Sequence, residues 1–238
     1  MDYGTIAYSH GGADLIGRIA LPAGEGRHPA VLAMHDARGM GEVPLRRIGE
    51  LARMGYVGFA SDMYGGGEHY GEMPGGQQMW ALQTDPHKFR ARALACFEAL
   101  RAHPRVDPDR IAAIGYCFGG QCVLEIARSG ADLKLGISYH GLLTTSLPAG
   151  PGAIKGLVSV FNGSEDPYVL PEHIADFEKE MKAAGARFQA TLYSGVLHAF
   201  TDPKAAEMKI VPGVAYDPLA DRLSWAATTI LLEHCIGR

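Results

Sequence analysis

The residues in this chain whose types and spacing are best suited to chemistry lie in the stretch Gly115-Tyr116-Cys117-Phe118-Gly119-Gly120. An apolar run precedes this stretch and a helical pattern follows it. A cysteine between a strand and a helix, with small residues two positions before it and two positions after it, is typical of a sharp turn that presents a nucleophile. Such a turn leaves no room for side chains two residues before and two after its tip, and Gly115 and Gly119 meet that demand. The sequence therefore predicts that Cys117 is a thiol nucleophile at a strained turn.

An acid and a histidine follow Cys117 in the chain, each after its own apolar run. Asp166 comes after a turn-rich segment, and His198 follows the last predicted strand. His198 could hold the thiol proton and pass it to a leaving alkoxide, while Asp166 orients the imidazole. The order nucleophile, acid, histidine is the order of a known hydrolase triad. Of the competing residues, Glu165 is expected to point away from Asp166, and His140 precedes the acid in the chain.

Two backbone N–H groups are candidates for stabilising an oxyanion. The first belongs to Phe118, because the start of the helix after Cys117 carries free N–H groups and a positive field. The second is expected from the loop that follows the apolar run 30–34, and Ala37 is its best candidate. Together these groups would complete the machinery for acyl transfer.

The elements that must position these residues alternate along the chain. We expect a hairpin from strands 5–9 and 15–21, further strands at 30–34, 56–60, 111–114, 133–139, 157–161 and 188–193, and helices at 44–54, 89–102, 121–128, 171–184 and 219–235. Residues 65–86 have weak periodicity and are expected to form a surface excursion beside a pocket. This alternation predicts an α/β fold with a mostly parallel central sheet, an N-terminal antiparallel hairpin and a single domain over residues 1–238.

Composition limits the possible partners. The chain has 238 residues, of which 47% are apolar and 20% charged, and its net charge of −4 gives no sign of nucleic acid or anionic membrane as a partner. No apolar run is long enough to span a membrane, and Met1 to Thr5 do not resemble a signal peptide, so a cytoplasmic monomer is expected. The four cysteines show no paired spacing.

These motifs together resemble those of the dienelactone hydrolase family, the cysteine branch of the α/β hydrolases. The resemblance rests on the Cys117 turn and on four further segments, namely residues 35–39, 61–64, 163–166 and 198–200. It implies a three-layer α/β-hydrolase fold and a triad of Cys117, His198 and Asp166. It also implies hydrolysis of lactones or small carboxylic esters through an acyl-cysteine intermediate, with no cofactor and no metal.

The chain departs from this family at two positions. Well-studied members carry a glutamate that holds the resting thiol, and Asp36 stands at that place here, so Asp36 is expected to modulate the thiol. Those members also carry an arginine soon after the catalytic histidine, and none follows His198. Arg38 is the candidate to supply a cation for the substrate instead, with Tyr64 and Phe200 as further substrate contacts.

Three alternatives remain open from the sequence. One is a thiol-redox protein that uses Cys117 and Cys122, although positions five apart on a helix do not face each other. Another is a metal site formed by His35, Asp36, Asp62 and His69. The last is a non-catalytic binding protein on the same fold.

Overall fold

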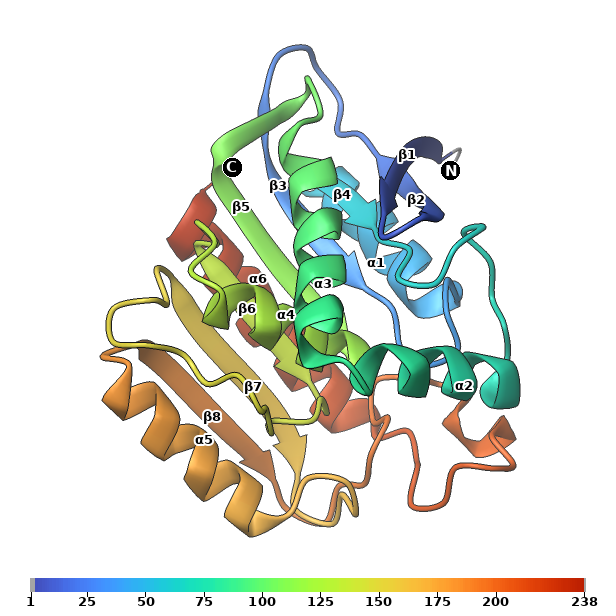
Figure 1. Cartoon of the computed structure of the whole chain (residues 1–238), viewed down its shortest axis with the longest axis vertical. Coiled ribbons are helices and arrows are strands. Elements are labelled where there is room, and N and C mark those ends of the chain that lie inside the picture. Colours follow the sequence, from blue (N-terminus) through green and yellow to red (C-terminus); the bar gives the residue numbers. More distant parts are fainter. Residues whose placement is uncertain (1–2, 238) are drawn as a thin grey trace.

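The computed structural model describes residues 3–237, so the ends of the predicted domain, residues 1, 2 and 238, lie outside it. Its centre is an eight-stranded sheet in the order β1-β2-β4-β3-β5-β6-β7-β8 (Figure 1). The strands are β1 (Gly4–His10), β2 (Ala13–Ala20), β3 (His28–Met34), β4 (Val57–Ala60), β5 (Val106–Tyr116), β6 (Leu135–Tyr139), β7 (Leu157–Gly163) and β8 (Arg187–Tyr193). From β4 to β8 all neighbouring strands are parallel, whereas β2 runs antiparallel to β1 and β4. The predicted mostly parallel sheet with an N-terminal hairpin is thus confirmed.

Helices cover both faces of this sheet and give the three layers. Helices α3 (Pro86–Arg101), α4 (Phe118–Arg128) and α5 (Pro171–Ala183) pack on one face, where the apolar core includes Phe97 and Phe177. Helices α1 (Glu42–Arg53) and α6 (Pro218–Ile236) pack on the other, where the core includes Leu51 and Leu232. Figure 1 shows α3 and α5 in front of the sheet and α6 behind it. The central strands are buried on both sides, which explains their continuous apolar sequences.

The structure contains one long helix that the sequence analysis did not predict. Helix α2 (Glu72–Gln83) lies within the segment expected to be an irregular excursion, and a short 3-10 turn (Ala205–Glu207) lies in the loop before α6. Helix α2 starts with Pro74, Gly75 and Gly76 in its first turns, which are poor helix formers. It buries only Gly75 and Leu82, so no apolar period is visible in its sequence.

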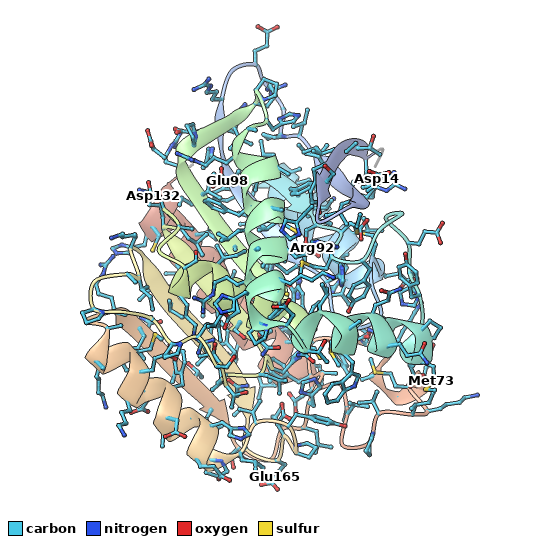
Figure 2. All side chains as sticks on the ribbon, viewed as in Figure 1. Asp14, Met73, Arg92, Glu98, Asp132 and Glu165 are labelled. Carbon is cyan, nitrogen blue, oxygen red and sulfur yellow. The ribbon has the colours of Figure 1, made fainter. Side chains whose placement is uncertain are left out.

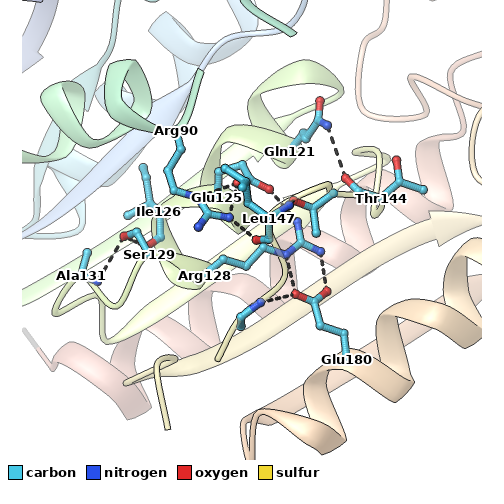
Figure 3. Close-up of polar contacts among 12 residues, drawn as sticks. Arg90, Gln121, Glu125, Ile126, Arg128, Ser129, Ala131, Thr144, Leu147 and Glu180 are labelled. Atoms are coloured by element: carbon cyan, nitrogen blue, oxygen red, sulfur yellow. Dashed lines mark hydrogen bonds and ion pairs between the residues drawn. The ribbon is translucent and has the colours of Figure 1, made fainter. Parts of the chain in front are cut away.

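A buried network of charged side chains joins three helices on one face of the sheet (Figure 3). Arg128 of α4 bonds to Glu180 of α5 at 2.8 Å and to Glu125 of α4 at 3.1 Å. Arg90 of α3 completes the network by pairing with Glu125 at 2.6 Å. Arg128 also donates to the carbonyl of Leu143, so the network fixes the segment that follows β6.

No helix in the part of the chain from residue 3 to residue 237 is long and apolar enough to cross a membrane.

Candidate active site

Cys117 lies at the tip of a strained turn between β5 and α4. Its backbone angles are φ 52° and ψ −116°, a region that L-residues with side chains rarely adopt. The turn closes because its neighbours are glycines. A Cβ on Gly115 would lie 2.0 Å from the carbonyl oxygen of Gly119, and a Cβ on Gly119 would lie 2.3 Å from that of Met34. The steric demand predicted from the sequence is therefore present, and it costs about 1–3 kcal/mol of backbone strain.

His198 lines the same pocket as Cys117 and forms a buried pair with Asp166. The Nδ1 atom of His198 lies 2.8 Å from Oδ2 of Asp166, and both side chains are almost fully buried. Burial alone would lower the pKa of His198. The Cys117 sulfur and the hydrogen-bonded Asp166 carboxylate outweigh burial and raise that pKa to about 10. An imidazolium is thus favoured beside the sulfur, and its proton is available for a leaving group.

The loop after β7 presents Asp166 and turns its neighbour outward. Oδ1 of Asp166 accepts a hydrogen bond from the backbone N–H of Tyr168 at 2.8 Å, which leaves Oδ2 for the imidazole. Glu165 is exposed at the rim of the molecule, as Figure 2 shows. The loop also touches the backbone of the His198 loop, because a Cβ on Gly163 would lie 2.0 Å from the carbonyl oxygen of Val196. These contacts fix the acid relative to the histidine.

His140, which the sequence analysis set aside, lies directly beside the Cys117 turn. Its Nδ1 atom accepts a hydrogen bond from the backbone N–H of Cys117 at 3.2 Å, and its Nε2 atom lies 2.9 Å from Oγ1 of Thr201. Because a backbone N–H can only donate, the ring proton sits on Nε2 and points to Thr201. Burial first, and then the nearby His198, hold the pKa of His140 well below its ordinary value. His140 is therefore a neutral positioning residue, which its place after β6 could have suggested.

The loop that carries Ala37 is held from several sides. The hydroxyl of Tyr64 donates to the Ala37 carbonyl at 3.1 Å, and the N–H of Tyr70 donates to the Arg38 carbonyl at 2.7 Å. Helix α2 touches the same loop, since a Cβ on Gly75 would lie 2.3 Å from the Ala37 carbonyl oxygen. The loop adjoins the start of α4, whose first N–H groups have no acceptor within the helix. Ala37 and Phe118 thus lie on adjoining backbone segments at the carboxyl edge of the sheet.

Asp36 and Arg38 form an ion pair with each other rather than with the thiol. The Asp36 carboxylate accepts from the Arg38 N–H at 2.7 Å and from its guanidinium Nη2 at 2.5 Å. The same Nη2 lies 2.6 Å from Oδ2 of Asp202, which belongs to the loop after His198. Burial would lower the pKa of Arg38, but the two carboxylates raise it above its ordinary value, so Arg38 stays charged. Both Asp36 and Arg38 line the pocket that contains Cys117.

That pocket has an internal volume of about 70 Å³. Its apolar wall comes from α1 and from the loop between β8 and α6, namely Val43, Met208, Val211 and Val214. It opens into a groove of about 970 Å³ that shares six lining residues with it: Asp36, Arg38, Val43, Glu72, Asp202 and Met208. A small organic substrate could therefore enter along the groove and place its reacting group beside Cys117.

Two residues expected to contact the substrate lie behind the pocket wall. Phe200 is fully buried and packs edge-on against His140, with ring centroids 5.1 Å apart. Tyr64 stacks on Phe118 at 5.8 Å while its hydroxyl bonds to Ala37. Neither is among the residues that line the pocket, and each contacts a residue that is, Phe200 through His140 and Tyr64 through Ala37.

Several residues of the alternative sites make other contacts in the structure. The Asp62 carboxylate accepts N–H groups of Tyr64 and Gly67, and the ring of His35 bonds to the backbone of Asp36 and Met63. Within residues 3–237 there is no group of three His, Cys, Asp or Glu residues that could hold a metal ion. Cys122 is fully buried, and burial raises its pKa well above the ordinary value, which disfavours thiol exchange.

Comparisons with known proteins show the family and the fold of this chain. The profile of the dienelactone hydrolase family matches residues 15–236. A crystal structure of a dienelactone hydrolase-like promiscuous phosphotriesterase from metagenomic libraries superposes with a TM-score of 0.91 at 30% identity, over 99% of both chains. The structure named m3DLH also gives 0.91, at 35% identity over 99% of this chain and 98% of its own. A probable 2-oxo-3-(5-oxofuran-2-ylidene)propanoate lactonase from Bradyrhizobium is 26% identical over 95% of this chain and 92% of its own. The chain belongs to the dienelactone hydrolase family.

Proposed function

We propose that this protein hydrolyses lactones or small carboxylic esters through an acyl-cysteine intermediate. The observation that carries the proposal is that Cys117, at its strained turn, and His198 line one pocket, with Asp166 bonded to His198 behind it. Membership of the dienelactone hydrolase family and the lactonase among its relatives support the same reaction. The thiol-redox and binding alternatives have no comparable support.

In the first half of the reaction, the Cys117 thiolate attacks the substrate carbonyl carbon. The N–H groups of Phe118 and Ala37 receive the negative charge that forms on the carbonyl oxygen. When the carbon–oxygen bond breaks, the imidazolium of His198 gives its proton to the departing alkoxide. Asp166 stabilises the charged imidazole before this step, in agreement with the raised pKa of His198.

In the second half, water hydrolyses the acyl-cysteine. The neutral imidazole of His198 now takes a proton from water, and the resulting hydroxide attacks the thioester carbonyl. The same two backbone N–H groups stabilise the second oxyanion. Collapse of this intermediate releases the carboxylic acid and restores the thiolate–imidazolium pair, so no cofactor is consumed.

The decisive experiment measures turnover of p-nitrophenyl acetate and a panel of lactones by the wild type and by Cys117→Ala. We expect the variant to lose activity by about 10³-fold or more, because the nucleophile is absent. Cys235→Ala is the matched control, since it removes a half-buried thiol from α6 outside the pocket. Mass spectrometry of quenched wild-type reactions should reveal an acyl group on Cys117. Wild-type turnover by Cys117→Ala would refute the proposal.

A second candidate reaction is hydrolysis of uncharged phosphotriesters. It is suggested by the phosphotriesterase that shares this fold at 30% identity, and the largely apolar wall of the pocket favours neutral substrates. The thiolate would attack phosphorus and displace an aryloxide, and water would then break the S–P bond of the phosphoryl-cysteine, which releases a dialkyl phosphate and restores the thiolate. Release of p-nitrophenol from diethyl p-nitrophenyl phosphate by the wild type, and its loss in Cys117→Ala, would establish this activity.

A further inference from the structure

The active-site pocket is lined by more anionic than cationic side chains. Among the described residues that line it, the cations are Arg38 and the imidazolium of His198, whereas Asp36, Glu72 and Asp202 are carboxylates. Glu72 accepts N–H groups of Lys209 and Ile210, and these bonds lower the pKa of its carboxyl, so it stays ionised. The mouth of the pocket therefore carries a net negative charge.

Arg38 is already neutralised by two of these carboxylates. Its guanidinium contacts Asp36 through Nε and Nη2, and the same Nη2 contacts Asp202 at 2.6 Å. The Arg38 side chain is about one-fifth exposed and that of Asp202 about one-tenth, so water screens these contacts only in part. An incoming carboxylate would have to displace Asp202 or lie beside two like charges, and like charges placed together weaken binding strongly.

We propose that Asp202, by occupying Arg38, makes this site selective for uncharged acyl groups and excludes substrates that carry a free carboxylate. The inference rests on the ester or lactone hydrolysis proposed above and defines its substrate class. The printed name of the Bradyrhizobium relative describes a lactone that bears a carboxylate, so the inference separates the preference of this chain from that of the relative. Asp202 acts here as a specificity-determining residue.

The test compares two p-nitrophenyl esters of equal chain length. One is p-nitrophenyl butyrate, which is neutral, and the other is the mono-p-nitrophenyl ester of succinic acid, which ends in a carboxylate. The measured quantity is the ratio of kcat/KM for the anionic ester to kcat/KM for the neutral ester. Because both substrates meet the same enzyme sample, the ratio is independent of the fraction that is correctly folded.

We expect the wild type to prefer the neutral ester and Asp202→Asn to raise the anionic-to-neutral ratio by about tenfold or more. Asparagine keeps an oxygen that can accept from Arg38, so the substitution changes mainly the charge. Glu207→Gln is the matched control, because it removes an equal charge from the outer groove away from the inner pocket. The double variant Arg38→Gln/Asp202→Asn should lose the gain, because the freed guanidinium is absent.

Four results would overturn the inference. The first is a wild type that prefers the anionic ester. The second is an equal rise of the ratio in Glu207→Gln and Asp202→Asn, which would show that only net charge matters. The third is a ratio that is unchanged in Asp202→Asn. The fourth is a gain that persists in the double variant, which lacks Arg38. If the wild type hydrolyses neither ester nor any lactone of the panel, the proposed function itself fails, which is a different result.

Discussion

At the scale of single residues, the site depends on which proton each histidine holds. His198 and His140 are neighbouring rings, with centroids 5.0 Å apart, yet their pKa values shift in opposite directions. The pKa of His198 is raised against burial because Cys117 and Asp166 face it, whereas burial and the nearby His198 lower the pKa of His140. One ring is therefore suited to carry a proton to the leaving group and the other to hold the turn.

The raised pKa of His198 predicts the pH dependence of activity. In the wild type, kcat/KM should fall as pH rises through about 10, because the imidazolium proton is lost. Asp166→Asn removes one group that raises this pKa, so the alkaline limb should move to lower pH by about 1–3 units. The measurement is the pH profile of kcat/KM on a neutral ester. Glu165 is the exposed neighbour of Asp166, and Glu165→Gln is the control because it should leave the alkaline limb in place. Identical pH profiles for the two variants would contradict the assignment of this limb to His198.

The same pKa has a consequence for stability. The folded pKa of about 10 is above the ordinary value of 6.5, so the folded state binds the proton more tightly than the unfolded state. The charged imidazole thus stabilises the fold fully below about pH 6.5, and this contribution disappears as pH rises through about 10. His140 has the opposite sign, because its lowered pKa makes stability decline as pH falls below about 6.5.

At the scale of elements, helix α2 matters more than its sequence suggests. Its glycine-rich first turns look like a loop, but Gly75 is the point where its backbone meets the Ala37 carbonyl. The glycine permits a close approach that no other residue would allow. We infer that α2 sets the position of the loop that carries the second oxyanion N–H.

Two adjacent glycines of α2 allow a sharp test of this contact. Gly76→Ala should stabilise the protein by about 0.5–1 kcal/mol, because alanine favours helix and a Cβ there meets nothing within 4 Å. Gly75→Ala should instead destabilise it by about 1–3 kcal/mol and lower kcat, because its Cβ would overlap the Ala37 carbonyl. Urea unfolding and ester turnover measure both effects. If Gly75→Ala behaved like Gly76→Ala, the proposed role of α2 would be wrong.

At the scale of the whole molecule, the helices of one face are joined by charge as well as by apolar packing. Arg128 lies between Glu125 and Glu180 and is almost completely buried (Figure 3). It also bonds to the carbonyl of Leu143, in the segment that leaves β6 just after His140. A paired buried charge adds little net stability over apolar residues, but a broken pair is costly.

Arg128→Ala should therefore lower the free energy of unfolding by about 3–5 kcal/mol, because two carboxylates would lose their partner. Lys182→Ala is the control, since it breaks an exposed pair with Glu178 and should change stability by about 0.5 kcal/mol or less. Urea denaturation measures the free energy of unfolding of each variant, and its dependence on urea concentration, the m-value, should be unchanged. If Arg128→Ala lowered the free energy of unfolding as little as Lys182→Ala does, the charged network would not stabilise the packing of these helices.

Much of the architecture was determined by the sequence alone, for local physical reasons. Short continuous apolar runs bounded by turn residues are typical of buried strands, and helical spacing marks α1, α3 and α5, so the sheet and most helices were predicted. The turn at Cys117 was predictable because the positions two residues before and after it have no room for a side chain, and glycines stand at both. The order of Cys117, Asp166 and His198 predicted that they lie at one edge of the sheet, since parallel strands bring their carboxyl ends together.

Other features were decided only by the tertiary structure, because they depend on partners distant in the chain. Helix α2 has no apolar period, and its position follows from contact with Ala37. The neutral state of His140 follows from its burial and from the nearby His198, and Arg38 is paired with Asp202, which is 164 residues away in the sequence. The sequence by itself predicted that Cys117, Asp166 and His198 lie near the same edge of the sheet. The tertiary structure decided which charges face the substrate, because burial and pairing set the charge of each group.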